Sequence, residues 1–192
     1  FVLYQLVDLQ RNGESVRMSK RTGKVITLSN LLDEISVDAV RFFFNSRQNE
    51  SHLEFDLDLA VKEDSDNPVY YVQYAHARIC TMLKKLAEAG LFPSKAEETD
   101  IGLLSEQAEK ALIKQIAMLP EEIRLAARDY EPFRLTRYLV ELATAFHSFY
   151  TEVRIKDAEE KTARARLMLC DVTRSVLSNV LSMLKISAPE QM

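Results

Sequence analysis

The sequence has no tryptophan, few helix-breaking residues and few cysteines. Only four glycines and five prolines occur among its 192 residues, so we expect long regular elements rather than a coil-rich fold. The two cysteines, Cys80 and Cys170, lie in apolar helical patterns and form no Cys-x-x-Cys pair or Cys/His cluster. They predict two buried free thiols in a reducing compartment, and no metal site. No apolar run approaches the ~20 residues that span a membrane, so we expect no membrane association.

The charge balance is slightly acidic. The chain has 25 Lys and Arg against 29 Asp and Glu, with a net charge of −4 and a pI near 5.5. A protein that binds nucleic acid without specificity is usually basic, so the composition argues against that class. A specific RNA-binding protein can still gather its cations locally. Seven tyrosines and nine phenylalanines supply rings for a core or for stacking on bases.

The N-terminal third predicts a hairpin, a basic loop and short helices. Phe1–Leu9 is typical of a strand, and Asn12-Gly13 is a strong signal for a tight hairpin turn to a second strand over 15–18. A hairpin alone is marginally stable, so we expect residues 1–30 to be the tail of an α/β domain that this chain lacks. Residues 31–65 should connect the domains, with Ser29 as the N-cap of a helix over 30–35, a helix over 37–46, an extended or looped segment over 51–58 and a short helix over 57–63.

Residues 66–192 predict a helical domain. Pro68 opens a helix that Gly90 should end, because proline suits a first turn and glycine a position just past the last one. Further apolar stripes predict helices over 101–119, from Pro120 to Tyr130, from Pro132 to about Val153, and over 158–185. To be buried, the apolar stripes of these helices must pack against one another. The predicted fold is therefore mainly α, an antiparallel helical bundle preceded by a short β-hairpin.

The basic loop has the composition of a phosphate-binding segment. Arg17, Met18, Ser19, Lys20 and Arg21 follow the second predicted strand, with Lys24 close behind. A lysine can follow a departing pyrophosphate as a mobile point charge, and an arginine can hold two phosphate oxygens at once. The alternative is a solvated basic turn without a ligand.

One face of the helix that begins at Pro68 combines aromatic rings with a cation. Tyr71, Tyr74 and Arg78 lie at i, i+3 and i+7. Rings and a guanidinium on one face suit unstacked bases and a phosphate. The alternative is a tyrosine stripe half-buried in the bundle. We expect His76 and His147 to be helix-packing residues with satisfied nitrogens.

The basic loop resembles the KMSKS-type loop of class I aminoacyl-tRNA synthetases. Lys20 matches the second lysine of that motif, Met18, Ser19 and Arg21 match directly, and Arg17 replaces the first lysine. The resemblance implies that Lys20 and Arg21, with Ser19, contact the ATP phosphates. The segment Val37–Phe44, within the helix predicted over 37–46, contains Asp38-Ala39-Val40-Arg41, which resembles the Asp-Ala-Leu-Arg segment of arginyl-type enzymes. We expect Asp38 and Arg41 to form a local i,i+3 pair.

Three later segments resemble the anticodon-binding domain of arginyl-tRNA synthetases. They are NPVYYVQYAHARI from Asn67, FHSFY from Phe146 with Val153-Arg154 after it, and APEQM at the C-terminus. The resemblance spans essentially the whole chain. It implies an anticodon-contacting set, namely Tyr71, Tyr74, Arg78, Tyr150, Arg154 and Met192.

The resemblance further implies a parent enzyme that attaches arginine to tRNA(Arg) with ATP and magnesium, through an arginyl-adenylate. This chain has no His-x-Gly-His motif, so we expect the fragment alone to be inactive and to hold no cofactor. We expect a monomeric, cytoplasmic protein. Two alternatives stay open: the same part of another class I enzyme, such as the cysteinyl type, and a helical protein-interaction module that binds no RNA.

Overall fold

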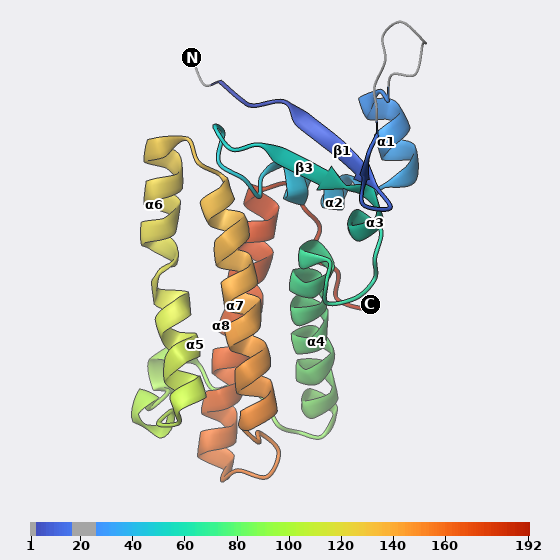
Figure 1. Cartoon of the computed structure of the whole chain (residues 1–192). Helices are drawn as coiled ribbons and strands as arrows, with labels where there is room; N and C mark the ends of the chain where they lie inside the picture. The colour runs from blue at the N-terminus through green and yellow to red at the C-terminus, as the bar shows by residue number, and fades with distance from the viewer. Residues whose placement is uncertain (1–2, 17–25) are drawn as a thin grey trace, which may run out of the picture.

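The computed structural model describes residues 3–16 and 26–192. The predicted phosphate-binding loop, Arg17–Arg21 with Lys24, lies outside the described residues. The predicted class is confirmed: the fold is mainly α, with a small sheet at one end of a helical bundle (Figure 1). No helix in residues 3–16 and 26–192 is long and apolar enough to cross a membrane.

Within the described residues, the sheet has three strands in the order β2-β1-β3. Strands β1 (Val7–Arg11) and β2 (Glu14–Ser15) form an antiparallel hairpin about the predicted turn, but β1 is shifted from the predicted 1–9, since residues 3–6 are not part of it, and residues 17–18 of the predicted second strand lie outside the described residues. Its turn residues, Asn12 and Gly13, both have positive φ angles of 53° and 73°, as a tight two-residue turn requires. Strand β3 (Leu53–Asp56) pairs in parallel with β1, so the extended segment predicted over 51–58 completes the sheet.

Three short helices pack near the sheet: α1 (Leu28–Glu34), α2 (Val37–Phe44) and α3 (Leu57–Ala60). The predicted N-cap at Ser29 was wrong. Thr27 caps α1, because its hydroxyl accepts a hydrogen bond from the Asn30 amide at 3.2 Å, and the Asn30 side chain accepts one from the Thr27 amide. The ring of Phe55 packs edge-on against Phe43, with centroids 5.4 Å apart, and joins the sheet to α2.

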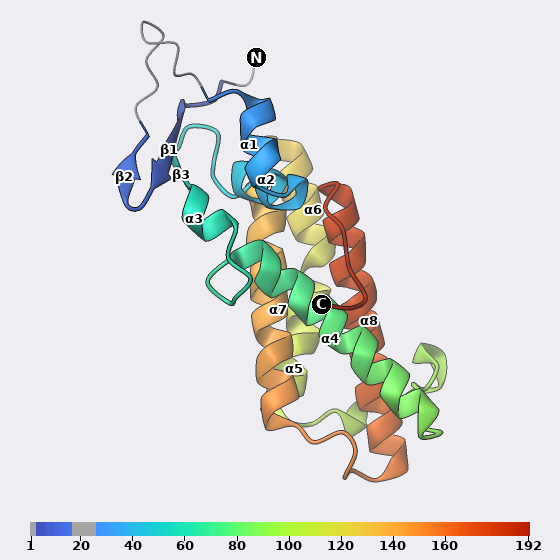
Figure 2. The ribbon, with the colours of Figure 1, turned by 90° about the vertical axis from the view of Figure 1, so that its right-hand side faces the viewer.

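The bundle consists of α4 (Pro68–Glu88), α5 (Gln107–Ala117), α6 (Leu119–Asp129), α7 (Phe133–Glu152) and α8 (Glu160–Met183). Helices α4, α7 and α8 run alongside one another, while α5 and α6 follow each other along the outer side of α7 (Figures 1 and 2). Gly90, with a φ angle of 82°, lies just past the end of α4 as predicted.

The helix predicted over 101–119 is divided. A single 3-10 turn, Ile101–Leu103, precedes α5, because the Asp100 side chain accepts from the Gly102 amide at 2.9 Å and closes a local turn. A new helix then begins at Gln107. The Glu109 carboxylate accepts from the Glu106 amide at 2.8 Å, which is one half of a capping box.

Asn67 joins the short helices to the bundle. Its side chain is buried, donates to the carbonyls of Ala60 at 3.3 Å and Lys62 at 2.8 Å, and accepts from the Val69 amide at 3.3 Å. It therefore caps α4 while it holds the end of α3. One continuous core of buried apolar side chains extends from Leu9 in the sheet to Ile186 after α8.

Two local expectations from the sequence are corrected. Among the described side chains, Asp38 does not pair with Arg41. Instead it accepts hydrogen bonds from Gln73 on α4 and from Ser187 near the C-terminus. Cys170 is buried as predicted, whereas Cys80 is only half-buried, and both thiols are free.

Candidate nucleic-acid interface

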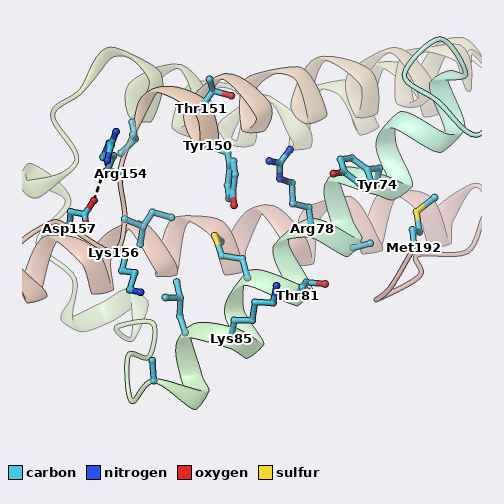
Figure 3. Close-up of a pocket in the computed structure, with 16 residues that line it drawn as sticks. Tyr74, Arg78, Thr81, Lys85, Tyr150, Thr151, Arg154, Lys156, Asp157 and Met192 are labelled. Atoms are coloured by element: carbon cyan, nitrogen blue, oxygen red, sulfur yellow. Dashed lines mark ion pairs between the residues drawn. The ribbon is translucent and has the colours of Figure 1, made fainter.

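An open pocket of about 710 Å³ lies between α4, the end of α7, the loop from α7 to α8 and the C-terminal residue (Figure 3). Five of the six predicted anticodon-contacting residues line it: Tyr74, Arg78, Tyr150, Arg154 and Met192. They come from four separate segments of the chain, which the bundle brings together.

The centre of the pocket is a cation between two aromatic rings. The Arg78 guanidinium carbon lies 4.1 Å from the Tyr150 ring centroid and 5.7 Å from the Tyr74 ring centroid. Tyr74 and Arg78 are four residues apart on α4 and so share a face, whereas Tyr150 comes from the last turn of α7 (Figure 3). Tyr74 is 39% exposed and Tyr150 is half-buried, so both present ring surface at the pocket.

Tyr71, the sixth predicted residue, does not line this pocket. It is half-buried and faces α7, where its hydroxyl donates to the Thr144 hydroxyl at 3.4 Å. Its ring centroid lies 4.8 Å from that of His147, and the His147 ring stacks at 6.0 Å on Tyr74. Tyr71 is therefore placed behind Tyr74, with His147 between them.

The surroundings of His147 disfavour the protonated form of its side chain. Burial, together with the positive charge of Arg78, lowers the pKa of His147 below its ordinary value of 6.5. Its Nε2 is buried and has no hydrogen-bond partner among the described residues, so the expectation of satisfied nitrogens was wrong for this side chain. His76 does meet that expectation at one nitrogen, because its Nδ1 lies 2.9 Å from the Pro189 carbonyl oxygen.

The pocket is positively charged although the chain is acidic. Four lining side chains are cationic, namely Arg78, Lys85, Arg154 and Lys156, and Asp157 is the one lining carboxylate side chain in the part of the chain that the structure describes. The lining side chains therefore carry a net charge of +3, against −4 for all side chains of the chain. Arg154 pairs with Asp157 at 3.5 Å (Figure 3), and because the Arg154 side chain is 86% exposed, this ion pair is weak and can be exchanged for a ligand.

Two of these cations were missed from the sequence. Lys85 follows Arg78 by seven residues, or two helical turns, so helical spacing could have placed it on the same face. Lys156 lies in the loop from α7 to α8, where no periodic pattern identifies it.

Flat rings beside cations can bind an extended, charged, aromatic ligand. Bases stack on rings and guanidinium planes, and phosphates pair with lysine and arginine. Residues 3–16 and 26–192 contain no group of three or more His, Cys, Asp or Glu side chains placed to hold a metal ion. The described pocket therefore has the chemistry of a site for single-stranded nucleic acid.

Comparison with known proteins gives a consistent identification. Residues 72–192 match the family described as the DALR anticodon binding domain. Over 191 residues the chain is 52% identical to the arginine–tRNA ligases of Caldanaerobacter subterraneus subsp. tengcongensis and Acetivibrio thermocellus. These alignments cover all of this chain and 34% of each relative, so the chain spans about one third of their length.

Solved structures agree with the sequence relatives. A structure described as an arginyl-tRNA synthetase of Campylobacter jejuni superposes with a TM-score of 0.83 at 33% identity, over 99% of this chain and 40% of that one. The arginyl-tRNA synthetase of Thermus thermophilus, at 24% identity, shares the fold with a TM-score of 0.71, over 90% of this chain and 29% of that one. The predicted resemblance to arginyl-tRNA synthetases is thus confirmed, and the chain belongs to the DALR anticodon-binding domain family.

Proposed function

We propose that this chain binds the anticodon arm of tRNA(Arg) as part of an arginyl-tRNA synthetase. The observation that carries this proposal is the Arg78 guanidinium held between Tyr74 and Tyr150, inside the region that matches the anticodon-binding family. The protein is acidic overall, yet four cationic side chains line this pocket. Such local clustering of positive charge is expected of a selective RNA-binding surface, whereas a non-specific binder is usually basic over its whole surface.

In the proposed complex, anticodon bases leave the loop stack and lie against the accessible ring surface of Tyr74 and Tyr150. Base–aromatic stacking contributes about 1–3 kcal/mol per base. Arg78 is already stacked on Tyr150, so little side-chain entropy is lost when it meets a base or a phosphate. Lys85, Arg154 and Lys156 are exposed around the stacking centre, where phosphates between splayed bases would lie.

For the parent enzyme we propose attachment of arginine to tRNA(Arg) through an arginyl-adenylate, with ATP and magnesium. Lys20 and Arg21, with Arg17, Met18 and Ser19, would act on the ATP phosphates, and the chain alone would not aminoacylate. We propose three parts for the chain: 1–30 as the end of the catalytic domain, 31–65 as a connector and 66–192 as the anticodon-binding domain. In the full-length enzyme, slow ATP–pyrophosphate exchange after Lys20→Ala would support this role, and normal exchange would contradict it.

The relatives favour an arginine enzyme over the cysteinyl alternative, because the proteins that are 52% identical to this chain are arginine–tRNA ligases. The helical-interaction alternative predicts no RNA contact at all. We propose a monomer in the cytoplasm, where tRNA charging takes place; sedimentation of the chain with and without tRNA would test the monomer.

The decisive experiment is a nuclease footprint of tRNA(Arg) bound to this chain, with tRNA(Cys) as the matched control. Protection confined to the anticodon arm of tRNA(Arg) is expected. Protection of tRNA(Cys) in place of tRNA(Arg) would favour the cysteinyl type. Absence of protection, with a folded chain, would favour the interaction module.

A further inference from the structure

The last seven residues run back along α4 after α8 ends. This segment, Ile186–Met192, is called the C-terminal strap here. It begins at the buried side chain of Ile186, next to Ser187, which is hydrogen-bonded to α2, and ends at Met192 in the pocket; its C-terminal end lies beside α4 (Figures 1 and 2). The strap thus connects the α2 end of the molecule with the candidate RNA-binding site.

Asp38 and Gln73 hold the start of the strap. Asp38 accepts from the Ser187 amide at 3.2 Å and also from the Ser187 hydroxyl. The Gln73 amide nitrogen donates to Asp38 at 2.9 Å and to the Ser187 carbonyl at 3.0 Å. These three residues form a closed set of hydrogen bonds between α2, α4 and the strap. Hydrogen bonds to a charged carboxylate are the stronger kind.

A second attachment lies one turn further along α4. The buried His76 ring donates from Nδ1 to the Pro189 carbonyl at 2.9 Å, which fixes that imidazole hydrogen on Nδ1. Beyond this point Glu190, Gln191 and Met192 are exposed, and Met192 has 53% of its surface accessible. The position of Met192 therefore depends on the attachments that precede it.

We propose that Asp38 and Gln73 are positioning residues for RNA binding: through Ser187 they fix the strap, so that Met192 is held at the pocket beside Tyr74 and Arg78. This inference rests on the proposed function. A strap that is already ordered loses less conformational entropy when RNA binds, so its attachments raise affinity without touching the ligand. It also gives Asp38 a role in RNA binding, which the predicted local pair with Arg41 would not provide.

A double-mutant cycle on binding of an anticodon stem-loop RNA of tRNA(Arg) tests the proposal. Asp38→Ala should weaken binding about tenfold in the unaltered chain, the scale of removing a hydrogen bond to a charged group. In the Met192→Ala background the same change should have little further effect, because the strap then has no side chain to place. Arg41→Ala, on the same helix but outside the hydrogen-bonded set, is the matched control and should leave affinity unchanged.

Amide hydrogen exchange of the strap provides a readout that general destabilisation would not give. Asp38→Ala and the milder Ser187→Ala should speed exchange in the strap while the protected amides of α7 keep their rates. Equal reductions of affinity with and without Met192, or unchanged strap exchange, would overturn the proposal. Failure of the unaltered chain to bind the RNA would instead overturn the proposed function, and the positioning role with it.

Discussion

The Arg166 guanidinium donates to the Glu109 carboxylate at 2.6 Å, and this ion pair is almost wholly shielded from water. The Glu109 side chain has 0% of its surface exposed and that of Arg166 has 12%. Arg166 also donates to the main-chain carbonyl of Arg154 at 2.9 Å. One side chain on α8 therefore fixes both the start of α5 and the loop that supplies Arg154 and Lys156 to the pocket.

Glu109→Gln should reduce the free energy of unfolding by about 3 kcal/mol, because it leaves the Arg166 charge without its partner in a nearly dry site. Urea unfolding, followed by circular dichroism, measures the change. The matched control is Glu121→Gln on the exposed Glu121–Arg124 pair, for which the unfolding midpoint should not move. Similar shifts for the two variants would show that burial does not govern the strength of these pairs.

Arg78→Ala should weaken binding of the anticodon stem-loop by about 1–3 kcal/mol, since it removes both a charge and a planar group stacked on Tyr150. Arg78→Lys keeps the charge but not the planar stack, so it should recover only part of the affinity. Fluorescence titration measures the affinities. Arg128→Ala removes an exposed arginine from α6 and controls for net charge. If it weakened RNA binding as much as Arg78→Ala does, Arg78 would act only by long-range electrostatic attraction.

Lys85→Ala and Lys156→Ala should each make RNA binding less sensitive to salt. For each phosphate of single-stranded RNA that the protein no longer neutralises, the slope of log Kd against log salt concentration should fall by about 0.7. Titrations at several KCl concentrations measure the slope. Lys110→Ala, on the exposed face of α5 and outside the pocket, should leave it unchanged. If all three variants gave the same slope, Lys85 and Lys156 would not be the residues that contact the phosphates.

In mild acid, the titration of His147 should lower the free energy of unfolding. Its pKa in the folded chain is lowered, first by burial and then by Arg78, whereas the unfolded chain should protonate near the ordinary value of 6.5. Below that pH the unfolded state binds more protons, so the free energy of unfolding falls as pH decreases from about 7 until the folded side chain also protonates.

His147→Gln removes this titration, so its stability should change less between pH 7.5 and pH 5.5 than that of the unaltered chain. Urea unfolding at the two pH values measures the difference. An independent check is the NMR titration of His147, whose pKa should rise in Arg78→Ala because a neighbouring positive charge is removed. A steeper pH dependence in His147→Gln would contradict the sign of this argument.

Local patterns predicted most helices, because capping and apolar spacing act within a few residues. Pro68 and Gly90 bound α4 as their backbone preferences require. Strand pairing did not follow in the same way. Parallel pairing of β3 with β1 joins residues 46 apart, and no local pattern specifies it. The division of residues 101–119 depends on side-chain hydrogen bonds at Asp100 and Glu109 that compete with a continuous helix.

The candidate site was accessible to sequence reasoning only in part. Spacing of four residues placed Tyr74 and Arg78 on one face, and the structure has them there. Tyr71, seven residues before Arg78, shares that face by spacing, but it lies two turns nearer the start of α4, where its ring packs against His147 of α7 instead of lining the pocket. Tyr150 lies 72 positions after Arg78, so family resemblance rather than periodicity indicated it. Asp38 was interpreted as a local helix pair because its partner Ser187 is 149 residues away.

The buried amide of Asn67 has a mechanical consequence. Rotation of the sheet against the bundle about this connection would strip Asn67 of its acceptors at Ala60 and Lys62 and leave polar groups unsatisfied out of reach of water. We therefore expect such a rotation to be costly. Helix α4, with 21 residues, is about 31 Å long and spans the distance from this connection to the pocket, so in the proposed complex we expect the RNA rather than the protein to adjust its shape.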